Sequence, residues 1–225
     1  MENTTRTVLA SALPMAAPWS LSGRKRLFDI CCALVLCTAA APVMVILALV
    51  VKASSRGPFL FRQNRIGKNG EEFPLLKFRT MYPFTGNNPG AFLTRSGDSR
   101  VTPVGRWLRQ WKLDELPQFF NVLMGDMSLV GHRPDMSKYM QTLTGEDRNI
   151  RYFRPGITGL ASLRFRNEEQ ELAKVPPQEM EQFYISNLLP QKIRIDLEYA
   201  ERATFLSDCG ILLRTAFLVL GRGRG

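Results

Sequence analysis

Two adjacent carboxylates, Asp114 and Glu115, stand in the densest polar stretch of the chain, RQWKLDELPQFFNVLMGDMSLVGHRPD at residues 109–135. Such a pair can divide one reaction between its members. An aspartate can attack phosphorus and hold it as an acyl phosphate, while its neighbour binds Mg²⁺ together with phosphate oxygens. Phosphoryl transfer also needs cations, which neutralise the charge that grows on the transferring group. The sequence offers Lys77, Arg79, Arg109, Arg133 and Arg166.

The same pair of carboxylates has a purely structural interpretation. Pro117 is tolerated in the first turn of a helix. Asp114 would then cap that helix, and Glu115 would be a first-turn acid that the helix dipole stabilises. Both interpretations stay open from this stretch alone. The sequence contains neither a P-loop motif nor GxGxxG, so it does not indicate a P-loop or Rossmann phosphate site.

The composition limits the partners and the kinds of site. The 225 residues carry a formal net charge of +10, which indicates an anionic partner such as nucleic acid, acidic lipid headgroups or phosphorylated small molecules. The four cysteines show no CxxC spacing, and His132 is the only histidine. Neither a zinc site nor a disulfide framework is therefore indicated.

One strongly apolar segment must help to position these side chains. No charged residue occurs from Ile30 to Val51. A helix of this length measures about 33 Å, against a hydrocarbon core of about 30 Å. A buried helix of a soluble protein is one alternative, but such helices seldom lack charge for so long. A signal peptide is another, but the segment starts far from Met1 and continues past the small residues at 38–41.

The basic residues on both sides of this segment indicate how it lies. They are Arg24, Lys25 and Arg26 before it, and Lys52, Arg56, Arg62, Arg65 and Lys68 after it. Basic residues favour the cytoplasmic side of a membrane, so a straight span would carry one group across. A helix that enters the bilayer and returns keeps both groups inside, and Pro42 can break the helix for that purpose. A straight, kinked span stays as the alternative, and the flanks favour re-entry.

The remaining patterns predict an α+β, mainly helical protein. Asn69-Gly70 between two runs of apolar and basic residues predicts a β-hairpin over 59–81. Residues 103–124 look helical with an interruption near Pro117, while 125–136 and 154–167 have loop composition. The apolar segment 209–220 could lie on a membrane surface or against the domain core, and both readings stay open.

We therefore divide the chain into four parts. These are a flexible N-terminal tail (1–23), a re-entrant membrane helix (24–55), a cytoplasmic catalytic domain (56–206), and a C-terminal interfacial helix with a basic tail (207–225). The protein is expected to be monotopic, with a helix-break-helix in the membrane.

Several motifs together resemble the bacterial sugar transferase family, the monotopic phosphoglycosyl transferases. The motifs are RKRLFDI, GPFLFRQNRIGKNGEEFPLLKFRTM, TPVGRWLRQWKLDELPQFFNVLMGDMSLVGHRP and RPGITGLA. They occur in family order, and the resemblance runs from about Arg24 to about Leu220. Any one of them would be modest evidence, whereas KFRTM, LDELPQ and RPGITG in one chain are specific.

The resemblance implies a reaction and a set of partners. A nucleotide diphosphate sugar, usually a UDP-sugar, donates its sugar-1-phosphate to a membrane polyprenyl phosphate, and a nucleoside monophosphate leaves. This step starts the assembly of a glycan of the exopolysaccharide, capsule or O-antigen type. The implied location is the bacterial inner membrane, with the catalytic domain on the cytoplasmic face and in contact with membrane lipids. The oligomeric state is open, a homodimer included.

The resemblance also implies roles for single residues. Asp114 attacks the sugar-bearing phosphate and holds it covalently, and Glu115 helps to bind Mg²⁺ as the cofactor. The residues that match basic positions around the phosphates, or a further acidic position, are Lys77, Arg79, Arg109, Arg133, Arg166 and Asp196. At the membrane break the chain has Ala41-Pro42 where Ser-Pro is common, so a supporting hydrogen bond must come from elsewhere. His132 replaces a common proline, and we expect it to shape its loop.

Two other functions compete with the transferase. A non-catalytic membrane adaptor would bind anionic lipid through basic residues and would not need the carboxylate pair. Nucleic-acid binding is allowed by the charge, but the apolar segment and the lack of a base-reading motif argue against it.

Overall fold

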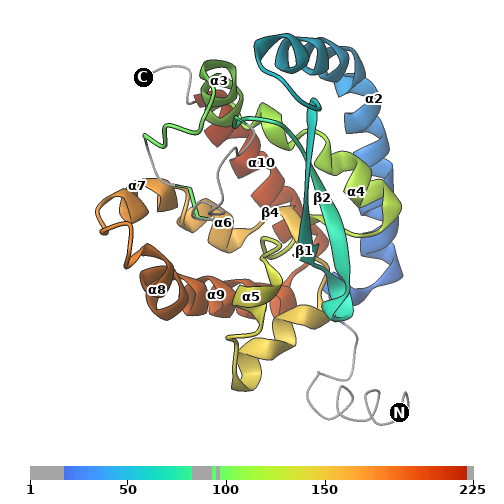
Figure 1. Ribbon diagram of the computed structural model, residues 1–225. Coiled ribbons are helices and arrows are strands. Elements are labelled where there is room, and N and C mark those ends of the chain that lie inside the picture. The colour runs from blue at the N-terminus through green and yellow to red at the C-terminus, as the bar shows by residue number, and fades with distance from the viewer. Residues whose placement is uncertain (1–17, 83–92, 95–96, 222–225) are drawn as a thin grey trace.

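The structure is a computed structural model that describes residues 18–82, 93–94 and 97–221. It is mainly helical, with two small sheets, as Figure 1 shows. The helices are α2 (Gly23–Ser54), α3 (Pro103–Gln110), α4 (Gln118–Met124), α5 (Ser137–Met140), α6 (Leu160–Arg164), α7 (Glu168–Ala173), α8 (Met180–Phe183), α9 (Leu189–Arg202) and α10 (Phe205–Gly221). The 3-10 helices are η1 (Trp19–Leu21), η2 (Lys68–Gly70), η3 (Leu113–Glu115) and η4 (Gly145–Tyr152), and η5 (Tyr184–Leu188) is a π-helical turn.

The long apolar helix α2 is bent. Its ribbon rises along one side of the molecule and then turns over the top, where its last turns lie against α3 (Figure 1). Pro42 lies inside the helix and has no N–H for the carbonyl of Thr38. The Thr38 hydroxyl instead donates to the carbonyl of Leu34 at 2.8 Å, a bond that often bends helices. Thr38 therefore provides a side-chain hydrogen bond next to the break, where Ala41 has no hydroxyl.

One face of α2 contacts the rest of the protein and the other faces are free. Ala33, Cys37, Met44, Leu47 and Val51 are buried at spacings that place them on one stripe. Among the described residues, α2 is the one helix long and apolar enough to cross a membrane, and only 22% of its most apolar window is buried. A core helix of a soluble protein would be mostly buried, so this exposure favours contact with lipid.

The predicted hairpin is present and it holds the far end of α2. Strands β1 (Leu60–Ile66) and β2 (Glu72–Phe78) pair antiparallel, and Asn69 and Gly70 have the positive φ angles of 61° and 81° that the turn requires. Arg79 follows β2. Its guanidinium donates to the carbonyls of Val51 (3.1 Å) and Ser55 (2.7 Å) and also bonds Pro58. A cation is favourable at this helix end because the unpaired carbonyls there carry negative partial charge.

A second sheet lies in segments that the sequence analysis predicted as loops. Strands β3 (Ser128–Val130) and β4 (Gly156–Thr158) pair in parallel. The backbones approach closely, since a Cβ on Gly156 would lie 2.1 Å from the nitrogen of Gly131. Strands of three residues are too short for alternation to reveal them, which explains why composition indicated loops.

The near end of α2 is fixed by a buried polar cluster. The Lys25 ammonium lies 2.6 Å from Asp208 Oδ2 and 3.6 Å from Asp29 Oδ1. Asp208, on α10, also accepts hydrogen bonds from Trp19 (2.8 Å) and from the Tyr199 hydroxyl (2.6 Å). Residues 18–22 of the expected flexible tail are thus held against the domain, and residues 1–17 lie outside the described part.

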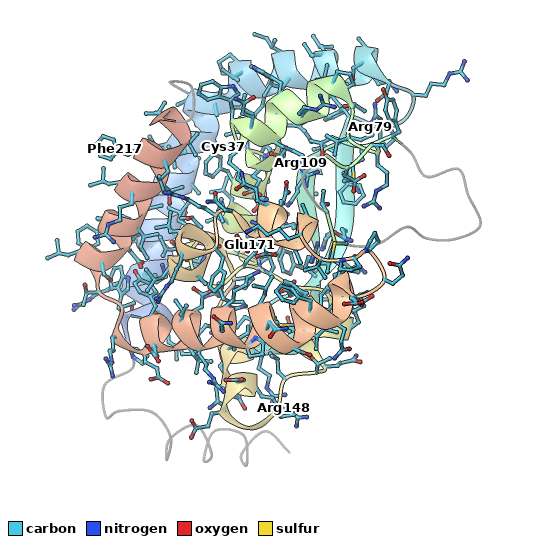
Figure 2. The ribbon with its side chains drawn as sticks, turned by 90° about the vertical axis from the view of Figure 1, so that its left-hand side faces the viewer. Cys37, Arg79, Arg109, Arg148, Glu171 and Phe217 are labelled. Carbon is cyan, nitrogen blue, oxygen red and sulfur yellow. The ribbon has the colours of Figure 1, made fainter. Side chains whose placement is uncertain are left out.

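The C-terminal helix α10 has one buried and one apolar exposed side. Ile211 is buried against the core between α2, β2, α4 and β3. Leu206, Leu213, Phe217 and Leu220 are exposed, and Figure 2 shows Phe217 on the outer side of the helix. The two readings of this segment are therefore compatible, since one face contacts the core and the other is free to contact lipid. The basic tail from 222 lies outside the described residues.

The cluster around Asp208 generates a stability prediction. We expect Asp208→Ala to lower the free energy of unfolding by about 3–5 kcal/mol, because it leaves the Lys25 charge buried beside only one carboxylate. The matched control is Glu171→Ala, since Glu171 pairs with Lys174 at 2.8 Å on the surface. The control should change the stability by less than about 0.5 kcal/mol.

Equilibrium unfolding of both variants in the same detergent measures the difference. Equal effects of the two substitutions would contradict the assigned role of the cluster.

Candidate active site

The two carboxylates sit in a short connection between two helices. α3 ends at Gln110, η3 carries Asp114 and Glu115, and α4 begins at Gln118. Both side chains are largely buried, with 7% and 9% of the residue exposed. Pro117 occupies the N-cap of α4, and no side-chain cap bond is present there. The helix-capping interpretation of Asp114 is therefore wrong, and these buried carboxylates need another explanation.

Glu115 lies between two cations from different elements. Its Oε1 is 3.1 Å from an Arg133 guanidinium nitrogen and 3.6 Å from the Lys77 ammonium. Lys77 comes from β2, and Arg133 follows β3. Burial alone would raise the pKa of Glu115, but the charges of Arg133, Lys77 and Lys112 lower it. Glu115 is thus an anion that draws both cations to the site.

Asp114 is in the opposite electrostatic situation. Burial and the adjacent Glu115 charge raise its pKa, against the opposing charges of Lys77, Lys112 and Arg109. Within the described part of the chain, its buried Oδ1 has no hydrogen-bond partner. An unpaired buried carboxylate oxygen is costly unless something else uses it. Asp114 is consequently the carboxylate that is free to react.

Lys77 is a more weakly basic lysine than usual. Burial and the nearby Arg133 lower its pKa to about 8, although Glu115 and Asp114 oppose the shift. The group is still mostly charged at neutral pH and can meet a phosphate. A cation held 3.6 Å from Glu115 and close enough to feel the charges of Asp114, Arg133 and Arg65 is a strong electrostatic element for anion binding.

The other predicted cations lie further out. The Arg109 guanidinium lies 3.0 Å from Glu169 of α7, and Figure 2 shows Arg109 below α3. Its charge is one of those that oppose the rise in the Asp114 pKa. Arg166 is exposed just after α6. Arg79 does not join the carboxylates, because its guanidinium is taken up by the end of α2. The structure thus brings Lys77 and Arg133 directly to the pair.

Asp196 also has an anchoring contact. Its Oδ1 accepts a 2.9 Å hydrogen bond from the backbone of Ala161, in the first turn of α6. Burial raises its pKa to about 7. The side chain therefore holds the segment that follows RPGITG against α9.

Sequence reasoning missed a polar network behind Arg133. Asp135 lies 3.7 Å from Arg65 and accepts a 2.8 Å hydrogen bond from the Tyr184 hydroxyl. The Lys192 ammonium lies 2.8 Å from Glu168 and 3.3 Å from the same hydroxyl. The Arg133 pKa is raised by Glu115, and also by Glu168 and Asp135, so the network holds Arg133 in its charged form. The one feature of the sequence that could have indicated this network is the position of Asp135, two residues after Arg133.

His132 is buried beside this network. Neither of its ring nitrogens has a hydrogen-bond partner among the described residues, and burial lowers its pKa to about 4. The imidazole is therefore neutral at physiological pH. A group that does not change its charge near neutral pH is poorly matched to acid–base catalysis, which agrees with the expected role in shaping the loop.

The site fits Mg²⁺ in one coordination mode only. The described residues contain no group of three or more His, Cys, Asp or Glu side chains arranged to hold a metal. Mg²⁺ is, however, commonly bound by one or two carboxylates and completed by phosphate oxygens and water. The unpaired Oδ1 of Asp114 and the adjacent Glu115 carboxylate supply that donor set.

Comparison with known proteins gives a consistent result. The sequence model of the family "Bacterial sugar transferase" matches residues 21–222. A UDP-glucose:undecaprenyl-phosphate glucose-1-phosphate transferase of Caulobacter vibrioides is 39% identical, covering 85% of this chain and 68% of that protein. The exopolysaccharide production protein PSS of Rhizobium leguminosarum bv. phaseoli is 34% identical, covering 89% and 97%.

Some relatives are much longer. A UDP-N-acetylgalactosamine-undecaprenyl-phosphate N-acetylgalactosaminephosphotransferase of Aeromonas hydrophila is 41% identical over 62% of this chain, which corresponds to 33% of its own length. The match to the family model nonetheless covers α2, the hairpin, the carboxylate pair and α10. The chain therefore belongs to the bacterial sugar transferase family.

Proposed function

We propose that this protein transfers a sugar-1-phosphate from a nucleotide diphosphate sugar to a membrane polyprenyl phosphate. The observation that carries the proposal is the unpaired, buried oxygen of Asp114 beside a carboxylate that holds two cations. The relatives named above support this class of reaction, two of them with a UDP-sugar and undecaprenyl phosphate in their names. A UDP-sugar is accordingly the proposed donor. The proposed pathway is the synthesis of an exopolysaccharide or a similar surface glycan.

The proposed chemistry proceeds in two displacements at one phosphorus atom. An Asp114 carboxylate oxygen attacks the sugar-bearing phosphorus, the bond from that phosphorus to the bridging oxygen breaks, and the nucleoside monophosphate leaves with the bridging oxygen and its electron pair. A phosphate oxygen of the polyprenyl phosphate then attacks the same phosphorus. The aspartyl–phosphorus bond breaks, and the carboxylate is regenerated as the lipid diphosphate sugar forms.

The cations near the pair stabilise this transfer. Lys77 and Arg133 already converge on Glu115, so a phosphate placed beside Asp114 meets positive charge with little rearrangement. Glu115 would hold Mg²⁺ together with phosphate oxygens. Asp114 would also contribute whenever it is not bonded to the phosphorus. Bound there, Mg²⁺ would neutralise phosphate charge and orient the donor.

We also propose that α2 enters the cytoplasmic membrane and returns. Both ends of the helix are bonded to the same folded domain, Lys25 to Asp208 at the start and Ser55 to Arg79 at the end. A hydrocarbon core of about 30 Å cannot separate two points that one compact domain holds. The bend near Pro42 and the basic residues on both flanks support the same arrangement, with the domain on the cytoplasmic face.

A single substitution tests the reaction. We expect Asp114→Asn to reduce the release of nucleoside monophosphate by at least about 1,000-fold, because an amide is a poor nucleophile and cannot form the acyl phosphate. The assay supplies the purified protein with polyprenyl phosphate, Mg²⁺ and a panel of UDP-sugars. Glu146→Gln, a change at an exposed position in η4, is the control and should retain full activity.

Binding to vesicles containing anionic lipid should be the same for the Asp114→Asn variant and the wild type. A wild-type protein that releases no nucleotide from any donor, yet still binds these vesicles, would favour the adaptor and overturn the transferase.

Cysteine labelling tests the topology. In a variant without the native cysteines, Arg24→Cys, Arg56→Cys and Glu171→Cys each place one thiol at an exposed position, in the first turn of α2, after α2 and in the domain respectively. Re-entry predicts that a membrane-impermeant maleimide labels all three from the cytoplasmic face only. Labelling of Arg24→Cys from the opposite face would show a straight span.

A further inference from the structure

Lys112, immediately before η3, has an unusual backbone conformation. Its φ and ψ are 55° and 20°, in the left-handed region. Among the described non-glycine residues only Asn69 shares a positive φ. Asparagine adopts this region readily, whereas lysine has no local hydrogen bond that favours it. A side chain kept in such a position next to a reactive group calls for a functional reason.

The left-handed residue directs the carboxylates into the site. The Lys112 N–H donates to the carbonyl of Arg109 at 3.2 Å, and its own carbonyl accepts from the Glu115 N–H at 3.2 Å. The backbone thus changes direction between α3 and η3 at a single residue, Lys112. Glycine or asparagine would make the same turn, so the turn alone does not explain a lysine here.

The Lys112 side chain supplies the remaining reason. It is exposed, and its residue lies directly beside the carboxylate pair, since its carbonyl accepts the hydrogen bond of the Glu115 N–H. Its charge also acts to lower the pKa of both Asp114 and Glu115. Among the other predicted cations, Lys77 and Arg133 face Glu115 and Arg109 faces Glu169, whereas Arg166 is exposed after α6. In the described parts of the chain, no carboxylate lies within ion-pair distance of the Lys112 ammonium. Lys112 is thus an exposed cation beside the carboxylate pair, without an ion-pair partner among the described residues.

We propose that Lys112 binds the phosphate of the nucleotide that leaves from the donor. This role rests on the proposed transfer reaction. When the bond to the bridging oxygen breaks, the departing phosphate gains one negative charge, and an adjacent ammonium stabilises it. The exposed position agrees with this assignment, because a water-soluble donor enters from solvent and its nucleotide returns there. In this assignment the inner cations Lys77 and Arg133 bind the acceptor phosphate, which arrives from the membrane.

Three substitutions separate the charge of Lys112 from its backbone. Lys112→Gly and Lys112→Asn remove the charge and keep the left-handed turn, so the melting temperature should stay equal or rise. Both should lower kcat/KM for the donor by about 10- to 100-fold, the range expected for loss of one charged hydrogen bond. Lys112→Arg keeps the charge and should stay within about threefold of wild type. Arg194→Gln removes one exposed charge on α9 and is the matched control.

The two half-reactions locate the effect. Single-turnover release of nucleoside monophosphate without acceptor reports on the donor step, and the Lys112→Asn variant should be slow there. Its KM for polyprenyl phosphate should equal the wild-type value.

Four results would overturn the assignment. They are unchanged donor kinetics in Lys112→Gly and Lys112→Asn, an equal loss in Lys112→Arg, a defect confined to the acceptor step, or a lower melting temperature for the glycine variant. A wild-type protein without any nucleotide release would instead overturn the transfer reaction itself.

Discussion

The arrangement depends on the attachment of both ends of α2 to one domain. Lys25 is buried against Asp208 of α10, and the carbonyls at the other end of the helix are bonded by Arg79 after β2. In each contact a cation bonds oxygen atoms where water is largely excluded, so neither end can detach without a buried charge or carbonyl losing its partner. A straight helix of 32 residues would be about 48 Å long, whereas α2 bends and lays its last turns against α3.

The same anchors connect α2 to the carboxylate pair. Arg79 lies two residues after Lys77, so the strand that holds the end of α2 also delivers a cation to Glu115. In the proposed arrangement this keeps the carboxylates close to the level of the lipid headgroups. The donor can then remain in water while the acceptor keeps its chain in the bilayer. The charges divide accordingly: Lys77 and Arg133 hold Glu115 as an anion, while one oxygen of Asp114 has no partner among the residues that the structure describes.

Much of this could be predicted from local signals in the sequence. Asn69-Gly70 predicted the hairpin, uninterrupted apolar residues predicted α2, and the family motif identified the carboxylate pair. Contacts between distant segments could not be predicted in this way: the pairing of β3 with β4, the burial of Lys25 against Asp208, and the network of Arg65, Asp135 and Tyr184. Arg79 illustrates the limit, because the motif indicates a positive charge at this position but not the direction of the guanidinium. The left-handed Lys112 is likewise set by the closure of a turn.

The central claim is that Asp114 carries the phosphosugar between donor and acceptor. Mass spectrometry of the protein after rapid mixing with a UDP-sugar and no acceptor tests it most directly. The account predicts added mass equal to one sugar phosphate less water, confined to the peptide that contains Asp114, and its loss when polyprenyl phosphate is added. An adduct on another side chain, or lipid product that accumulates while no adduct forms, would contradict it.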